Sequence, residues 1–330
     1  MSGSLIFLFV AVIVSTGALS ILMLKKTIPI LKSHKVGQKI LDIGPRWHKS
    51  KEGTPTMGGI CFIIPTLVVS LLLFVYAYVI GEAKNLTPLA LTLLLGVMNG
   101  LIGFIDDYTK LIKKQNEGLK AYQKFSLQVV AACIYIFLMT LTGNMSTTLF
   151  IPFFNFTLEL GIFYYLFAII LICGITNSTN ITDGIDGLCA SVGAVVAAFF
   201  AVAGFLLKDI SVALASATLI GSCIGFLVYN FHPARIFMGD TGSLYIGGIL
   251  VGMAFTLNNP LIVLIAGFVF VFETISVMLQ VTSFKLTGKR IFKMSPVHHH
   301  FEKCGWNEVK IVAVFSAAAL LCCVGAFFGL

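Results

Sequence analysis

Aspartates stand in short segments beside long apolar runs. GFIDDYTK (103–110) places Asp106 and Asp107 side by side at the end of an apolar run about as long as one membrane span. MGDTGSL (238–244) places Asp240 between two glycines, directly before another apolar run. Each acid has a structural interpretation, as a helix end or an N-cap. Each also has a chemical one, because Mg²⁺ prefers carboxylate oxygens and shares them with substrate phosphates.

A third segment, NSTNITDGIDGL (177–188), spaces four polar residues at intervals of three: Asn177, Asn180, Asp183 and Asp186. Residues three apart are neighbours on a helical turn, so part of this series is expected to share one face. Two glycines in the segment, Gly184 and Gly187, indicate that it is not a regular helix throughout. A glycine also lets a ligand approach the backbone closely. Two acids and two amides exceed what a helix cap requires, so we favour a binding role over a polar loop.

Histidines form the fourth group, in PVHHHFE (296–302), where His298, His299 and His300 are consecutive. With only Cys304 nearby, their spacing matches no zinc finger. Imidazoles hydrogen-bond in either charge state, which favours donors to phosphate or sugar oxygens over packing of a loop. Glu273 stands apart, midway along an apolar run, where a charge is costly. For Glu273 we favour a polar contact between helices over a proton relay.

These residues must be positioned by a membrane protein. The chain has 330 residues, 58% hydrophobic and 11% charged, whereas soluble domains average about 25% charged. No polar linker divides it, so we expect one integral-membrane catalytic domain, residues 1–330. The predicted fold class is an all-α polytopic membrane protein of about ten transmembrane helices. The predicted spans lie near 5–24, 57–80, 88–105, 125–142, 160–176, 188–206, 211–229, 241–257, 260–282 and 309–329.

Basic residues orient these spans. Segments 25–56, 106–124 and 283–310 carry eight, five and six Lys or Arg, and Arg235 adds one more. Only Lys84 and Lys208 fall in the opposite loops. The positive-inside rule therefore makes the basic side cytoplasmic, and an even number of spans puts both termini outside. The acids, amides and histidines lie on the basic side, so we expect a cytoplasmic-face site. The net charge of +8 is explained by orientation and does not indicate nucleic-acid binding.

The motifs together resemble a known family. GTPTMGG (53–59), FIDDYTK, the NxxNxTDGxDGL pattern, NFHPARIFMGDTGSL (230–244) and PVHHHFE occur in the order of the polyprenyl-phosphate N-acetylhexosamine-1-phosphate transferases. Within that superfamily, GTPTMGG and PVHHHFE are similar to the bacterial phospho-N-acetylmuramoyl-pentapeptide transferases (MraY type). The resemblance covers essentially the whole chain.

The resemblance implies a reaction at a Mg²⁺ site in the bacterial inner membrane. Phospho-N-acetylmuramoyl-pentapeptide would pass from UDP to undecaprenyl phosphate, releasing UMP and forming the first lipid intermediate of peptidoglycan synthesis. It also implies an acidic centre of Asp106, Asp107 and Asp240, with Asp240 the first choice as metal ligand. Implied substrate-binding residues are Lys51, Thr56, Lys110, Lys124, Asn180, Asp183, Gly184, Asn230, Phe237, Gln280, His298, His299 and His300.

Several alternatives remain open at this point. Adjacent helical residues point about 100° apart, so Asp106 and Asp107 are expected to differ in role. We expect Asp107 to handle a proton and Asp106 to organise the metal and phosphates. Direct attack by the lipid phosphate is favoured over a covalent phospho-aspartate. The other functions considered are a UDP-N-acetylglucosamine transferase and, in a different class, a nucleotide-sugar or lipid transporter. A homodimer is left open.

Overall fold

The chain folds into a bundle of helices. The computed structural model describes residues 3–33, 51, 53–113 and 117–330, so the basic segment 34–50 and Lys114 lie outside the described residues. The elements run in the order α1 (Gly3–Ser33), α2 (Ile60–Val79), η2 (Ala83–Leu86), α3 (Thr87–Lys113), α4 (Ala121–Leu141), β1 (Thr148–Ile151), β2 (Phe156–Glu159), α5 (Phe163–Thr182), α6 (Leu188–Leu206), α7 (Ile210–Asn230), α8 (Gly239–Thr256), α9 (Ile262–Ala266), α10 (Phe268–Thr287), α11 (Val297–Glu302) and α12 (Glu308–Phe327).

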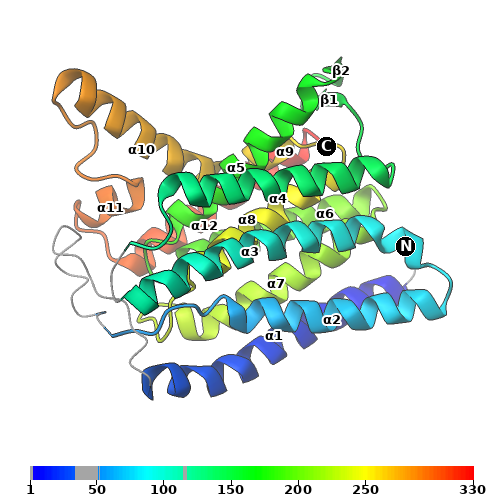
Figure 1. Ribbon diagram of the computed structural model, residues 1–330, viewed down its shortest axis with the longest axis horizontal. Helices are drawn as coiled ribbons and strands as arrows, with labels where there is room; N and C mark the ends of the chain where they lie inside the picture. The colour runs from blue at the N-terminus through cyan, green and yellow to red at the C-terminus, as the bar shows by residue number, and fades with distance from the viewer. Residues whose placement is uncertain (1–2, 34–50, 52, 114–116) are drawn as a thin grey trace.

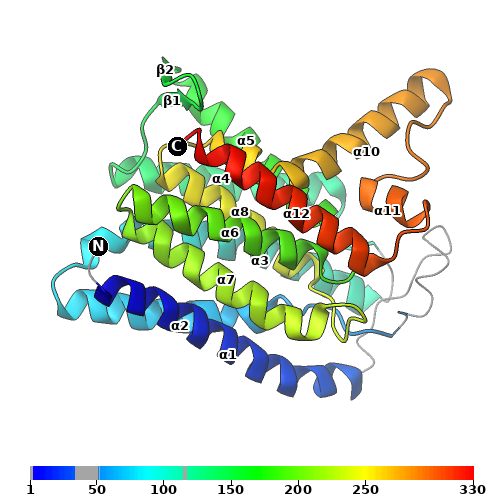
Figure 2. The same ribbon diagram turned by 180° about the vertical axis from the view of Figure 1, so that it is seen from behind.

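The predicted membrane class is confirmed. In the described part of the chain, nine helices are long and apolar enough to cross a membrane. The predicted span 241–257 forms α8, which is not among the nine because its first turn, Gly239 to Thr241, is polar. The predicted span 260–282 is wrong as one helix, since the chain breaks at Gly267 into α9 and α10. Both termini lie at the same end of the bundle (Figures 1 and 2).

Two helices extend further than predicted. The span expected at 88–105 continues to Lys113, so Asp106 and Asp107 belong to helix α3 and not to the loop after it. An i,i+4 ion pair between Asp106 and Lys110, at 2.6 Å, favours helix in this last part. The span expected at 160–176 continues to Thr182, which places Asn177 and Asn180 on α5. Asp106, Asp107, Asn177 and Asn180 therefore sit on helices.

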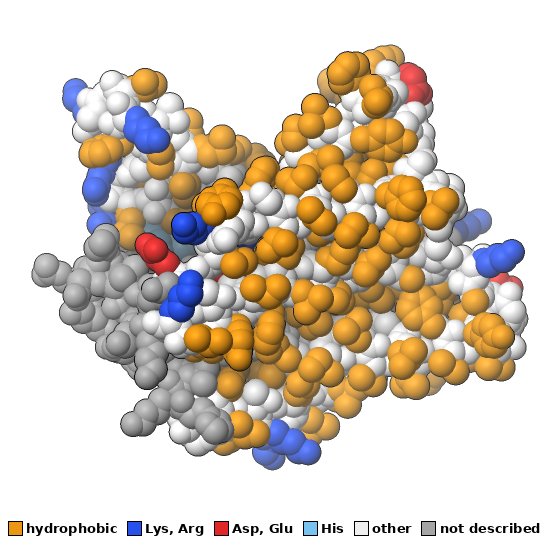
Figure 3. All heavy atoms as spheres, in the orientation of Figure 1, with side chains coloured by type: hydrophobic (Ala, Val, Ile, Leu, Met, Phe, Trp, Pro, Cys, Tyr) orange, Lys and Arg blue, Asp and Glu red, His pale blue; other side chains and the backbone are white. Residues whose placement is uncertain are grey.

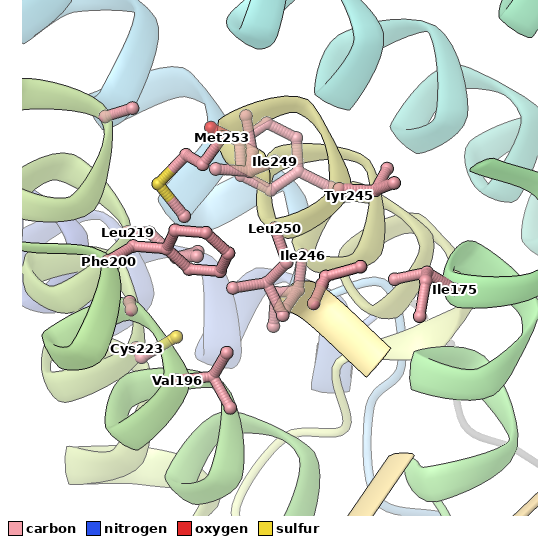
Figure 4. Close-up of a cluster of buried hydrophobic side chains, with 14 of the residues drawn as sticks. Ile175, Val196, Phe200, Leu219, Cys223, Tyr245, Ile246, Ile249, Leu250 and Met253 are labelled. Carbon is pink, nitrogen blue, oxygen red and sulfur yellow. The ribbon is translucent and has the colours of Figure 1, made fainter. Parts of the chain in front are cut away.

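Helix α8 runs through the middle of the bundle. Every residue from Thr241 to Thr256 is buried, in contact with residues of α3, α5 and α7. Figure 4 shows Tyr245, Ile246, Ile249, Leu250 and Met253 of α8 packed among apolar side chains from α5, α6 and α7. A helix buried on all sides tolerates a polar residue only where partners surround it. Asp240, in its first turn, is consequently held by neighbours.

The periphery is apolar, as expected of a lipid-facing surface. Hydrophobic side chains cover most of the face seen in Figure 3, and the charged side chains visible there lie near the two ends of the bundle. Helix α10 diverges from the other helices (Figure 1), and it carries exposed apolar residues such as Met278 and Phe284. A short antiparallel hairpin, β1–β2, pairs Thr148 with Glu159 and was not predicted.

Candidate active site

Three aspartates converge at one end of α3 and α8. Asp106 and Asp107 come from α3 and Asp240 from the first turn of α8, and one oxygen of each lies within 4.8 Å of the others. The ammonium of Lys110 lies among them, 2.6 Å from Asp106, 3.7 Å from Asp107 and 3.3 Å from Asp240. We call these three aspartates the acidic centre. The predicted grouping of Asp106, Asp107 and Asp240 is what the structure brings together.

Asp107 holds the start of α8. Its Oδ1 accepts a hydrogen bond from the Asp240 N–H at 3.2 Å. Its Oδ2 accepts from the Thr241 N–H at 3.0 Å and the Thr241 hydroxyl at 2.7 Å. The first N–H groups of a helix have no partner within it, so a carboxylate here acts as a cap from another helix. Asp107 thereby fixes the position of Asp240.

Glycines allow α3 and α8 to approach this closely. A Cβ built on Gly103 would lie 2.2 Å from the carbonyl oxygen of Asp240, so any side chain there would push the two helices apart. Gly239 has φ +73°, a left-handed conformation that favours glycine, directly before Asp240. The two glycines are therefore part of the geometry of the acidic centre.

Helices α4 and α5 complete the centre. Lys124 of α4 is 2.7 Å from Asp240 Oδ2 and donates to Asn180 Oδ1 at 3.0 Å. Asn180 of α5 donates to Asp240 Oδ1 at 3.0 Å and to the Ser243 hydroxyl at 2.9 Å. Both oxygens of Asp240 are thus occupied, and its side chain remains 19% exposed. Asn180 is thus in direct contact with the acidic centre through Asp240.

The chemistry of this donor set fits a divalent cation. Three carboxylates converge on one point, and the structure already places a cation there, the Lys110 ammonium. Hard oxygen ligands of this kind suit Mg²⁺. Three carboxylates and two lysines leave one formal negative charge. A divalent cation would reverse its sign, which would favour binding of a polyphosphate.

Asp183 ends α5 beside this centre. Burial raises the pKa of its carboxyl to about 8, with smaller contributions from the negative charges of Asp240, Asp107 and Asp186. Asp183 therefore keeps its proton at neutral pH in the protein without metal, and it differs in charge from the three converging acids.

This raised pKa predicts a pH-dependent stability. An unfolded aspartate releases its proton near pH 3.9, whereas folded Asp183 retains it to about pH 8. Between these two pH values the folded state binds one proton more than the unfolded state. The contribution of Asp183 to the free energy of unfolding is therefore fully present below the lower pH value and is lost as the pH rises toward the higher one. We expect Asp183→Asn to flatten the fall in thermal unfolding midpoint from pH 5 to pH 8, measured in detergent with a chelator. An unchanged slope would contradict this assignment.

A second cluster joins four segments of the chain. Lys51 Nζ lies 2.7 Å from Asp186 Oδ1 and 2.6 Å from a Glu308 oxygen. Asp186 Oδ2 accepts from the Ala234 N–H and lies 3.0 Å from Nδ1 of His232. Lys51 was predicted as a site residue, but His232 and Glu308 were missed. His232 stands inside the quoted motif NFHPARIFMGDTGSL, and Glu308 follows PVHHHFE by six residues, so position relative to these motifs was the available signal.

Other predicted residues use their polar atoms within the protein. Asn230 accepts from the Gly187 N–H at 3.0 Å and donates to the Ile236 carbonyl at 2.9 Å. The amide of Gln280 holds the backbone at Ile291 and Phe292. These side chains shape the loops around the site, and their contact with a substrate stays a prediction.

The other predicted residues lie in segments next to the acidic centre or in and around α11. Phe237 donates its N–H to the Pro55 carbonyl at 2.7 Å, which brings the half-buried Thr56 beside the approach to α8. His300 accepts from the Lys293 N–H at 3.1 Å, and His299 pairs with Glu302 at 2.5 Å. His299 and His300 thus have their polar contacts with nearby residues of the segment around α11.

Comparison with known proteins gives one match to a family model and one to a short signature. The model described as glycosyl transferase family 4 matches residues 89–258, which span all three converging aspartates. The pattern described as phospho-N-acetylmuramoyl-pentapeptide-transferase signature 1 matches residues 51–63, from Lys51 into α2.

Similar curated proteins span nearly the whole chain. A phospho-N-acetylmuramoyl-pentapeptide-transferase of Clostridium botulinum (strain Eklund 17B / Type B) is 45% identical over 306 residues, 92% of this chain and 90% of the relative. One of Staphylococcus saprophyticus is 45% identical over 296 residues, with coverage of 89% and 90%. One of Heliobacterium modesticaldum is 47% identical over 304 residues, with coverage of 92% and 90%.

Proposed function

The chain belongs to the phospho-N-acetylmuramoyl-pentapeptide-transferase family, and from this membership we propose how the acidic centre performs the transfer. The protein is an integral-membrane enzyme that transfers phospho-N-acetylmuramoyl-pentapeptide from UDP to undecaprenyl phosphate. We place the reaction at Asp106, Asp107 and Asp240, on the cytoplasmic face of the bacterial inner membrane. The observation that carries this placement is the convergence of the three carboxylates with Lys110 and Lys124.

The reaction exchanges one phosphoanhydride for another. An oxygen of the lipid phosphate attacks the sugar-bearing phosphorus, and the bond from that phosphorus to the bridging oxygen breaks. UMP leaves with the bridging oxygen and its electron pair. A phosphate monoester has a second pKa near 6, so the lipid phosphate is mostly dianionic at neutral pH. The main task of the enzyme is therefore to hold two mutually repelling anions in position, and removal of a proton is a smaller part of the catalysis.

We propose that the acidic centre holds Mg²⁺, with Asp240 as the principal ligand, because oxygens of three carboxylates converge there. Bound there, Mg²⁺ would neutralise phosphate charge that develops on the leaving UMP. Lys124 and Lys110 lie where their ammonium groups can pair with phosphate oxygens, as they now pair with Asp240. Because the side chain of Asp240 is partly exposed, the metal and the substrates can reach the acidic centre there.

Asp106 and Asp107 have different hydrogen-bond partners, which supports different roles for them. Both oxygens of Asp107 accept hydrogen bonds from α8, which supports a positioning role for Asp107 and weighs against the expected proton handling. Asp106 accepts from the Leu119 N–H at 2.8 Å and pairs with Lys110. We therefore assign Asp107 to fixing Asp240, and Asp106 to ordering Lys110 and the segment before α4.

UMP release tests the proposed direct attack. With UDP-N-acetylmuramoyl-pentapeptide, Mg²⁺ and undecaprenyl phosphate, we expect continuous UMP release, and with the lipid omitted far less than one UMP per enzyme. The reason is that the lipid phosphate itself is the nucleophile, so no enzyme group breaks the bond alone. The measurement is a rapid-quench count of UMP against enzyme concentration. A burst equal to the enzyme concentration without lipid would establish a covalent intermediate instead.

A substrate comparison tests the function itself. UDP-N-acetylglucosamine replaces the muramoyl-pentapeptide nucleotide in the same assay, with the same lipid. We expect release of UMP only with the pentapeptide substrate. Turnover of the simple sugar nucleotide at a similar rate would point to the sister transferase.

A further inference from the structure

Glu273 is a fully buried acid outside the acidic centre. It lies in the second turn of α10 and is 0% exposed. Its Oε2 accepts a hydrogen bond from the Val297 N–H at 2.8 Å, and its Oε1 lies 3.2 Å from Nδ1 of His298. An acid buried at such depth persists in membrane proteins where it has a partner and a function. Both contacts of Glu273 are made to α11, so it connects the diverging helix α10 to the histidine segment.

His298 is buried as completely as Glu273. Its side chain is 0% exposed, and neither ring nitrogen has a hydrogen-bond partner among the described residues. The distance to Glu273 is within ion-pair range, but the groups are not aligned as a hydrogen bond. Buried polar atoms normally have hydrogen-bond partners, so a buried imidazole nitrogen without a partner indicates a functional role. His298 thus has two ring nitrogens that accept or donate no hydrogen bond within the described part of the chain.

The far side of the His298 ring faces the turn after α5. A Cβ built on Gly184 would lie 2.2 Å from Nε2 of His298, so the ring occupies the space of a side chain at 184. The preceding residue, Asp183, lies close enough to the acidic centre for Asp240 and Asp107 to affect its carboxyl. A line of contacts therefore runs from Glu273 through His298 to the Asp183–Gly184 turn.

We propose that Glu273 is a positioning residue for the transfer reaction, acting through His298. It keeps the imidazole proton on Nδ1, so that Nε2 faces the Asp183–Gly184 turn as a hydrogen-bond acceptor in the substrate-bound enzyme. A carboxylate beside one ring nitrogen determines the tautomer and orientation of the ring. This inference rests on the proposed function, because it assigns the turn beside the acidic centre to substrate binding.

Glu273→Gln is the decisive variant. The amide is isosteric, and its oxygen can still accept from the Val297 N–H. Its NH₂ group would face Nδ1 and donate to it, which moves the histidine proton to Nε2. We expect kcat to fall about 10- to 100-fold while KM for the nucleotide substrate changes little. Ser276→Ala on the same helix is the matched control, since Ser276 is buried and donates only to the Glu273 carbonyl at 2.6 Å; it should retain wild-type kcat.

A double-mutant cycle separates positioning from packing. In a His298→Asn background, Glu273→Gln should cause no further loss, because the residue acts through a ring that is no longer there. Independent, multiplying losses would overturn the proposal. Gly184→Ala provides a second variant, since its methyl group would displace the ring with Glu273 intact. We expect the same selective loss of kcat in Gly184→Ala. Wild-type kcat in Glu273→Gln would contradict the inference whatever the result for Gly184→Ala.

A spectroscopic readout does not depend on turnover. In ¹⁵N-histidine-labelled protein, the difference spectrum between wild type and His298→Asn identifies the His298 nitrogens. We expect the protonated nitrogen to be Nδ1 in wild type and Nε2 in Glu273→Gln. An unchanged tautomer would overturn the inference and leave the proposed function intact. Failure of the wild type to release UMP would instead contradict the proposed function.

Discussion

Asp240→Asn is expected to lower kcat at least about 10³-fold, near the upper end of single-residue losses at preorganised catalytic sites. Asp240 joins all parts of the acidic centre, since its carboxylate meets Lys110, Lys124 and Asn180. An amide in its place removes the charge that holds a divalent cation and turns an NH₂ group toward a neighbour that also donates. Mg²⁺-dependent UMP release measures the loss, and thermal stabilisation by Mg²⁺ should weaken in parallel.

Asp209→Asn is the matched control for this change. Asp209 caps α7 by accepting from the Val212 N–H at 2.9 Å, and asparagine caps a helix about as well as aspartate. The control should therefore keep wild-type activity and stability. Asp240→Asn with more than about a tenth of wild-type kcat, or with an unaltered Mg²⁺ response, would remove Asp240 from the proposed centre.

Lys124→Met is expected to produce the second large loss, about 10²-fold in kcat/KM. Its side chain is 15% exposed, and its ammonium pairs with Asp240 and donates to Asn180. Among the described residues, Lys124→Met therefore leaves Lys110 as the one lysine that pairs with Asp240. The surplus negative charge would then repel a polyphosphate substrate. Steady-state kinetics over nucleotide-substrate concentration measure the effect, and Lys124→Arg should recover part of it because the charge is kept.

Lys113→Met provides the comparison for charge alone. Lys113 is exposed in the last turn of α3, one turn beyond Lys110. Both variants lose one positive charge at the same end of the bundle, but only Lys124 contacts Asp240. If Lys113→Met lost as much activity as Lys124→Met, general attraction of the substrate would explain both, and no specific role would remain for Lys124.

Hydropathy and charge predicted the class of fold because long apolar runs have few alternatives in a membrane. Helix ends were harder, since a polar residue near the end of a run marks either the end of the helix or a buried contact. Asp106 proved to be buried within its helix, and Asn180 half-buried within α5 with hydrogen bonds to Asp240 and Ser243. The break at Gly267 was also missed, because α9 and α10 are apolar on both sides of it. Hydropathy does not distinguish one helix from two that meet at an angle.

The acidic centre was predictable from its motifs, but its internal partners were not. Nothing in the sequence indicates that Asp107 bonds the start of α8, because that contact depends on how closely α3 and α8 approach. The same applies to Asn230 and Gln280, whose amides are used by nearby backbone. Residue type and position indicate that a side chain lies near a site. Only tertiary geometry shows whether its polar atoms remain available.

The ion pairs of Lys51 have a consequence for biosynthesis. Lys51 precedes α2 and Glu308 begins α12, so this contact joins positions 257 residues apart. A ribosome inserts the helices in order, and the partner of Lys51 is made only with the final helix. The cluster therefore closes last, after every residue of the acidic centre has entered the membrane. A chain interrupted before α12 would carry the three aspartates of the acidic centre without the ion pair between Lys51 and Glu308, so this cluster is complete only once α12 has been made.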